Sequence, residues 1–193
     1  MRSRFLLAVG VSILLAAVAF GQGRSSKEAI ESRMAQAEGV KLHYLTAGHG
    51  PFVILIHGYA ETSLMWKPII PLLAKKFTFI APDLPGIGDS EIPKDGLDMK
   101  TAAIRIHALA KSLGVDKARV VGHDIGLMVA YAYAAQFPAE TEKLIVMDAF
   151  LSGVAGWEDV YNNPHIWHFR FNGPTPEVLV RGRERTYFRT LLE

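Results

Sequence analysis

Consecutive apolar residues that recur along the chain constrain its fold more than any other feature of the sequence. Such runs are typical of strands buried on both faces of a parallel sheet, and they stand at 52–56 (FVILI), 77–81 (FTFIA) and 143–147 (KLIVM). Segments with helical spacing separate them, at 66–74, 99–113 and 127–137. Strands that alternate with helices predict an α/β fold with a mostly parallel sheet and helices on both faces.

The composition supports a folded domain and excludes several function classes. Half of the 193 residues are hydrophobic, which is enough for a substantial core. The absence of Cys excludes disulfides, a thiolate nucleophile and zinc sites built on sulfur. A formal charge of +2 gives no indication of nucleic-acid binding, and no metal, nucleotide or flavin motif occurs. The sequence therefore predicts no cofactor, no metal and no nucleic-acid partner.

The N-terminus has the order of a secretory signal peptide. Arg2 and Arg4 precede an apolar run over 5–20, and small residues accompany its end. We predict a signal peptide over 1–21, which places the mature chain outside the cytoplasm, secreted or periplasmic, without stable membrane insertion. An uncleaved anchor is the alternative, but the run is short for a span of about 20 residues.

Three further segments follow the signal peptide. The polar residues 22–38 predict a linker, and 39–150 carry the alternating strands and helices of the core. Residues 151–193 bring Trp, Tyr and Phe among polar residues and Pro, without a buried strand. We expect this last segment to begin a helical lid over the edge of the sheet.

The strongest chemical signal is the pentapeptide 122–126 (GHDIG), which follows a short strand and opens a helix rich in small residues. This context predicts a nucleophile elbow, with Gly122 and Gly126 leaving room for the tight turn. The exposed residue is Asp124, and a carboxylate there suits attack on an electrophilic sp³ carbon to give an alkyl ester. The alternative is that Asp124 only caps the helix. No G-x-S-x-G occurs, which counts against a serine esterase.

A second signal, 57–61 (HGYAE), follows the buried strand at 52–56. A bent loop there can aim a backbone N–H into the site, and oxyanion holes in such folds pair it with the N–H after the nucleophile. That nominates the backbone amides of Tyr59 and Ile125. We expect His57 to be a buried structural histidine. The turn-rich loop at 83–90 is expected to be tied by hydrogen bonds of Asp83 and Ser90.

These motifs, in this order, resemble the α/β-hydrolase superfamily, and more narrowly its aspartate-nucleophile branch of epoxide hydrolases and dehalogenases, including secreted bacterial epoxide hydrolases. The resemblance rests on HGYAETSLMW, APDLPGIGDSE, VGHDIG, LIVMDA and WHFRF together. It implies that Asp124 is the nucleophile, that Asp148 is the charge-relay acid and that His168 donates a hydrogen bond to the epoxide oxygen. From the residues alone, Asp148 could instead hold a loop at a strand end, and His168 could be a packed ring.

The chain departs from these relatives at several positions. Ile125 and Met128 stand where fluoroacetate dehalogenases carry Arg, and Ile125 replaces a Trp found in many haloalkane dehalogenases. These departures favour an uncharged epoxide over a haloacid. No His follows His168, although the family order is nucleophile, acid, then His. We therefore expect a chain truncated before the catalytic His, with 39–150 as the N-terminal part of the core, terminal strands missing and an exposed apolar sheet edge.

Three functions remain open from the sequence. The first is a cofactor-free epoxide hydrolase that acts with water on a small uncharged organic substrate. The second is a haloalkane or haloacid dehalogenase of the same fold. The third is a non-catalytic remnant or binding module. The oligomeric state, a homodimer included, also stays open.

Overall fold

The computed structural model of the protein describes residues 29–192. The expected signal peptide over 1–21 lies outside these residues, as does the first part of the expected linker. Within residues 29–192, no helix combines the length and the apolar composition that crossing a membrane requires.

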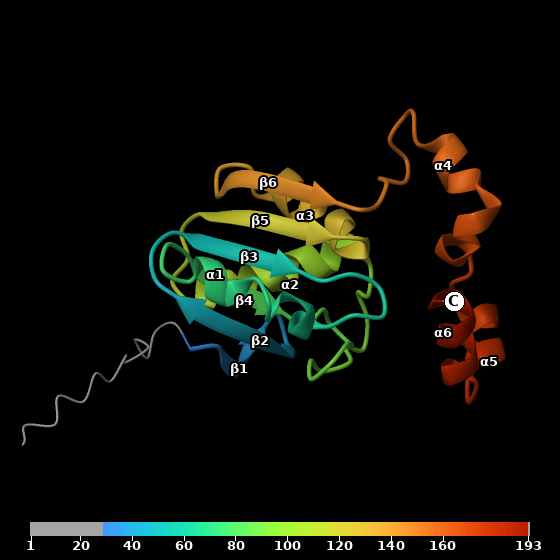
Figure 1. Ribbon diagram of the computed structural model, residues 1–193, viewed down its shortest axis with the longest axis horizontal. Helices are drawn as coiled ribbons and strands as arrows, with labels where there is room; N and C mark the ends of the chain where they lie inside the picture. The colour runs from blue at the N-terminus through green and yellow to red at the C-terminus, as the bar shows by residue number, and fades with distance from the viewer. Residues whose placement is uncertain (1–28, 193) are drawn as a thin grey trace, which may run out of the picture.

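A six-stranded sheet forms the centre of the described chain (Figure 1). In spatial order its strands are β1 (Glu31–Ala37), β2 (Val40–Gly48), β4 (Thr78–Pro82), β3 (Phe52–Ile56), β5 (Ala118–His123) and β6 (Thr141–Met147). The strands β4, β3, β5 and β6 run parallel, whereas β2 is antiparallel to β4 and to β1. The mostly parallel sheet predicted from the apolar runs is confirmed.

Helices and short 3₁₀ turns cover both faces of this sheet. They are α2 (Met99–Ser112) and α3 (Ile125–Gln136) on one face, and η2 (Ser63–Trp66) and α1 (Ile70–Leu73) on the other. Ile54 of β3 is fully buried in the core cluster that contains α2 and α3, and Val53 is buried in the cluster that contains Trp66 and Ile70. Burial on both faces explains why β3 is a continuous apolar run.

The expected linker over 22–38 is wrong for residues 31–37, which form β1. A tight turn at Glu38 and Gly39, with φ values of 46° and 74°, joins β1 to β2 as a hairpin. β1 is an edge strand with mostly exposed side chains, and exposed edges are commonly polar. The polar composition that suggested a linker is therefore explained by the edge position of a strand.

The strand β6 differs from the buried strand that its apolar sequence predicts. Within the described residues it pairs with β5 alone, and Leu144, Ile145 and Val146 are 36%, 49% and 45% exposed. These apolar side chains are exposed because β6 is the last strand of the sheet within residues 29–192, so no described strand flanks its other side. The exposed apolar edge that the sequence led us to expect is present there.

After β6 the chain leaves the sheet and forms a helical lid, as its aromatic and polar sequence predicts. The lid consists of α4 (Glu158–Asn162), η3 (Pro164–Arg170), α5 (Pro174–Val180) and α6 (Glu184–Leu192). Figure 1 shows it beside the end of the sheet toward which the arrows of β3, β5 and β6 point. The lid therefore faces the carboxyl ends of the parallel strands, where ligands bind in open α/β sheets.

Candidate active site

Asp124 occupies a sharp turn between β5 and α3. Its backbone has φ 50° and ψ −125°, a conformation that is strained for residues other than Gly. The Asp124 amide donates to the Met147 carbonyl at 3.0 Å, and the Leu127 amide donates to the Asp124 carbonyl at 2.8 Å. The strand, tight turn and helix expected around Asp124 are therefore all present.

The two glycines of this turn permit close contact between backbone segments. A Cβ on Gly122 would lie 2.2 Å from the Gly126 carbonyl oxygen. A Cβ on Gly126 would lie 2.5 Å from the His57 carbonyl oxygen and 2.6 Å from that of Ile56. Any side chain at Gly126 would therefore push the start of α3 away from the end of β3.

The carboxylate of Asp124 faces the loop after β3 and does not cap its own helix. No side-chain hydrogen bond caps α3 at Asp124. Instead, Oδ2 of Asp124 accepts a hydrogen bond from the Tyr59 amide at 2.8 Å. Ile125 is the first residue of α3, and amides in a first helical turn have no intrahelical acceptor. The interpretation of Asp124 as a helix cap is therefore not supported, and the Tyr59 amide lies where an oxyanion-hole donor is expected.

The loop after β3 is a compact turn in which Glu61 folds back onto the backbone. Its Oε2 accepts from the Gly58 amide at 2.8 Å, and Ala60 has a left-handed φ of 57°. The same Glu61 oxygen lies 3.1 Å from Nδ1 of His123. This loop is therefore tied both to itself and to the residue that precedes Asp124.

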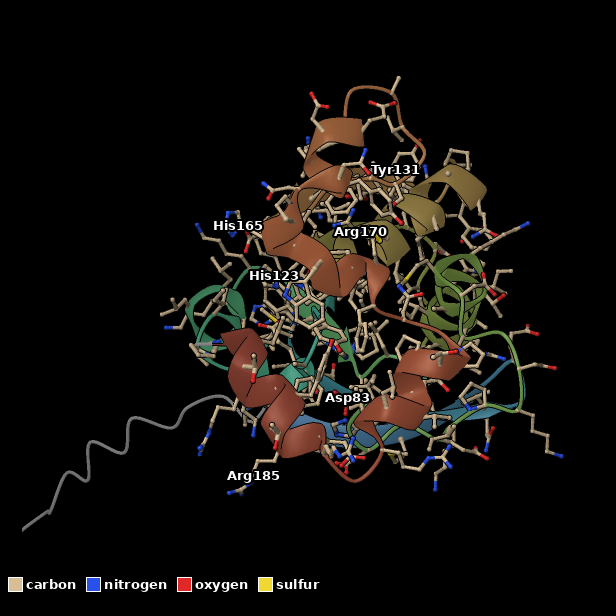
Figure 2. All side chains as sticks on the ribbon, turned by 90° about the vertical axis from the view of Figure 1, so that its right-hand side faces the viewer. Asp83, His123, Tyr131, His165, Arg170 and Arg185 are labelled. Carbon is tan, nitrogen blue, oxygen red and sulfur yellow. The ribbon has the colours of Figure 1, made fainter. Side chains whose placement is uncertain are left out.

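Asp148 follows β6 and stands beside the elbow. It has a positive φ of 60°, and its side chain is 82% exposed. Its Oδ2 lies 3.4 Å from Nε2 of His123. Figure 2, viewed from the lid side, shows His123 near the centre of the molecule. Asp148 thus lies at the strand end where the relay acid is expected, and that role stays a prediction.

His57 is fully buried, as predicted, and joins two loops. Its Nε2 accepts from the Leu84 amide at 2.9 Å, so the neutral ring carries its proton on Nδ1, 2.9 Å from the Gly58 carbonyl oxygen. Burial lowers the pKa of His57, and the hydrogen bond to Gly58 does not offset this effect. A neutral ring therefore links the loop after β3 to the loop after β4.

Asp83, labelled in Figure 2, ties the loop after β4 as expected. Ser90 Oγ donates to its carbonyl at 2.9 Å, and its carboxylate accepts from the Ser63 and Asp89 amides at 2.7 and 3.0 Å. Burial alone would raise the pKa of Asp83, but the hydrogen bonds from these two amides, together with that from His43, hold the pKa below its usual range. His43, Asp83 and Asp89 lie close enough to hold a metal ion. Both Asp83 oxygens already accept hydrogen bonds, so we assign this cluster a structural role.

His168 lies on η3 and lines a cavity between the lid and the elbow. The cavity has a volume of about 380 Å³, and none of the described residues that line it is Lys or Arg. Its apolar lining comes mainly from Met99, Ile125, Met128, Phe169 and Phe171. Nδ1 of His168 is buried without a hydrogen-bond partner among the described residues. Such a nitrogen is costly unless a bound molecule pairs with it.

Tyr59 connects the loop after β3 with the lid. Its ring stacks on that of His168 at a centroid distance of 6.4 Å, and its hydroxyl donates to the Tyr187 hydroxyl on α6 at 3.1 Å. Burial and the hydrogen bond with Tyr187 raise the pKa of Tyr59. Tyr59 therefore presents its amide to Asp124 and its ring to the cavity.

Sequence reasoning missed Glu61, His123 and Tyr187 as residues of this region. Glu61 and His123 belong to the two motifs that were identified, but their contact joins loops that are far apart in the sequence. Tyr187 lies in an amphipathic helical segment, where a Tyr is usually a packing residue. The available signal was that Glu61 and His123 are polar residues inside the two motifs that predicted the site.

The sequence pattern of the α/β-hydrolase fold family matches residues 51–188. The chain belongs to this family. It is 38% identical over 169 residues to a soluble epoxide hydrolase of Corynebacterium sp. (strain C12), and this match covers 84% of the chain and 59% of the relative. It is 29% identical over 174 residues to a fluoroacetate dehalogenase of Burkholderia sp., covering 86% of the chain and 57% of the relative.

Solved structures agree with this assignment. The chain superposes on the epoxide hydrolase CorEH with a TM-score of 0.73 and 34% identity, over 84% of this chain and 59% of that one. The α/β-hydrolase fold and the aspartate-nucleophile branch suggested by the motifs are thereby supported on sequence and structure. The chain spans less than two thirds of the length of the relatives it matches.

We expect Gly126→Ala to destabilise the protein by about 3 kcal/mol, because the new Cβ would clash with backbone atoms at the end of β3. Gly114→Ala is the matched control. Its Cβ meets no atom within 4 Å, so only its φ of +77° carries a cost, of about 1 kcal/mol. Chemical denaturation measures both values. Equal losses for the two variants would contradict the close contact at the elbow.

The lowered pKa of His57 predicts that stability falls in mild acid. In the unfolded chain, His57 takes up a proton at about pH 6.5. Burial disfavours the protonated ring in the folded chain, so the free energy of unfolding decreases as the pH falls below that value. The free energy of unfolding of the parent should drop more steeply between about pH 7 and 5 than that of His57→Asn. The exposed His49 provides the control, His49→Asn, which should follow the parent. Parallel curves for the parent and His57→Asn would contradict the buried neutral ring.

Proposed function

We propose that this α/β hydrolase opens the ring of a small, uncharged epoxide through an ester on Asp124. The observation that carries the proposal is the Tyr59 amide on Oδ2 of Asp124 at 2.8 Å, beside an apolar cavity that His168 lines. One carboxylate oxygen is oriented by this hydrogen bond, which leaves the other available for attack. The similarity to epoxide hydrolases supports the same reaction class.

In the first step, a carboxylate oxygen of Asp124 attacks the less hindered carbon of the epoxide ring. A C–O bond of the ring breaks, and its electron pair goes to the ring oxygen. His168, which lines the cavity, donates a hydrogen bond to this oxygen, and water supplies the proton that the oxygen takes up. The product of the step is a hydroxyalkyl ester of Asp124.

In the second step, water attacks the carbonyl carbon of this ester. The negative charge that develops on the Asp124 oxygen is stabilised by the Tyr59 and Ile125 amides. By the family resemblance, Asp148 has the role of orienting a His that activates the water, and residues 1–193 contain no His after His168. We therefore expect a polypeptide of residues 1–193 alone to form the ester faster than it hydrolyses it.

The dehalogenase alternative uses the same nucleophile on a carbon–halogen bond. A haloacid would need a cation for its carboxylate, yet Ile125 and Met128 line the cavity and none of its described lining residues is Lys or Arg. The similarity to a fluoroacetate dehalogenase keeps the alternative open to test. Halide release measured beside epoxide consumption separates the two reactions.

We also propose that residues 1–21 direct the chain out of the cytoplasm, as a secreted or periplasmic protein. The proposal rests on the order of charged, apolar and small residues at the N-terminus. The mass of the chain recovered from a bacterial periplasm is expected to correspond to a start near residue 22. A full-length chain in the membrane fraction would contradict it.

The reaction is tested by incubating the chain with a small terminal epoxide and measuring its intact mass. The parent should gain the mass of one epoxide, because the ester forms faster than it hydrolyses. Asp124→Ala should gain none, since it lacks the attacking oxygen. His49→Asn, at an exposed position outside the site, is the matched control, and it should still form the ester.

A folded parent that gains no mass and consumes no epoxide would contradict the proposal. In that case the binding-module alternative would lead. A mass gain of equal size in Asp124→Ala would show modification elsewhere and would also contradict it.

A further inference from the structure

We propose that His123 is a positioning residue, which bridges Glu61 and Asp148 and thereby holds the Tyr59 amide on the Asp124 carboxylate. The inference rests on the proposed function of Asp124 and concerns how that carboxylate is oriented. Three segments meet at this histidine: the loop after β3, the end of β5 and the residue after β6.

Both ring nitrogens of His123 face a carboxylate. Nδ1 lies 3.1 Å from Oε2 of Glu61, and Nε2 lies 3.4 Å from Oδ2 of Asp148. The side chain of His123 is 25% exposed, so solvent weakens these contacts only in part. A ring engaged on both sides has no nitrogen left to activate water at an ester on Asp124. We therefore assign His123 to positioning and not to general base catalysis.

The bridge reaches the Tyr59 amide through Glu61. The oxygen that faces His123 also accepts from the Gly58 amide, at 2.8 Å. The next amide along the chain is that of Tyr59, which donates to Asp124. Because Gly58 and Tyr59 are consecutive, a fixed position of the Gly58 amide limits how far the Tyr59 amide can move from Asp124.

The charges around this loop explain why a bridge is needed. Oxygens of Glu61 and Asp124 lie 2.7 and 3.0 Å from the point that a Cβ of Gly58 would occupy, so two carboxylates face the same small space. Like charges at such separations repel, and repulsion would push the loop away from Asp124. The contact of the His123 ring with Glu61 holds that carboxylate in place against this repulsion, and the contact with Asp148 on the other side fixes the ring.

Two variants separate the sides of the bridge. In His123→Asn, the amide nitrogen takes roughly the place of Nδ1 and keeps the donor to Glu61. In His123→Gln, the amide nitrogen takes roughly the place of Nε2 and keeps only the donor to Asp148. The exposed His49→Asn serves as a matched control.

The first measurement is the rate of ester formation on Asp124 at increasing concentrations of a small terminal epoxide, followed by intact mass. We expect His123→Gln to lower the rate at saturation about tenfold, which corresponds to one lost hydrogen bond to a charged group. The half-saturating concentration should not change, since the bridge does not touch the cavity. His123→Asn should stay within about threefold of the parent, because it keeps the donor to Glu61.

The second measurement is the NMR shift of the Tyr59 amide proton, which needs no activity. It should move upfield in His123→Gln and Glu61→Ala, because the hydrogen bond to Asp124 lengthens, and stay near the parent value in His123→Asn. If the parent forms no ester, the proposed reaction fails, and this shift alone decides the positioning role. Unchanged shifts in His123→Gln and Glu61→Ala would overturn the inference, as would equal rate losses in the Asn and Gln variants. If His123→Gln does not fold, Glu61→Ala decides.

Discussion

The close contact between the start of α3 and the end of β3 is the constraint on which the rest of the site depends. Gly126 permits it, because even a Cβ there would come within 2.6 Å of two carbonyl oxygens. The contact brings Asp124, at the top of the turn, beside the loop after β3. The strained backbone of Asp124, which costs roughly 1–3 kcal/mol, is stabilised by this surrounding structure.

Buried polar groups then fix the positions of the loops around this turn. The neutral ring of His57 joins the loops after β3 and β4, and the carboxylate of Asp83 accepts from the Asp89 amide of its own loop and from the Ser63 amide at the start of η2. These contacts leave the Tyr59 amide directed at Asp124, with the lid and its His168 above an apolar cavity. The oriented carboxylate, the amide donor and a cavity whose described lining residues include no Lys or Arg together support the proposed uncharged electrophile.

Much of this arrangement could be predicted from the sequence, because local patterns determine it. The apolar runs predicted the parallel strands, and GHDIG predicted the turn at Asp124. Other features depend on contacts between distant segments, which no local pattern records. The polar segment 31–37 is a strand because it pairs with β2 at the edge, and the apolar β6 is exposed because β5 alone flanks it among the described residues. The bridge from Glu61 through His123 to Asp148 was missed for the same reason.

The central claim is that the elbow selects Asp124 among three neighbouring carboxylates, the others being Glu61 and Asp148. The most direct measurement is peptide mapping by tandem mass spectrometry of the chain after reaction with a small terminal epoxide. The account predicts that the ester is found on the peptide containing Asp124, and on the Asp124 side chain within it. An ester on Glu61 or on Asp148, with Asp124 unmodified, would contradict it.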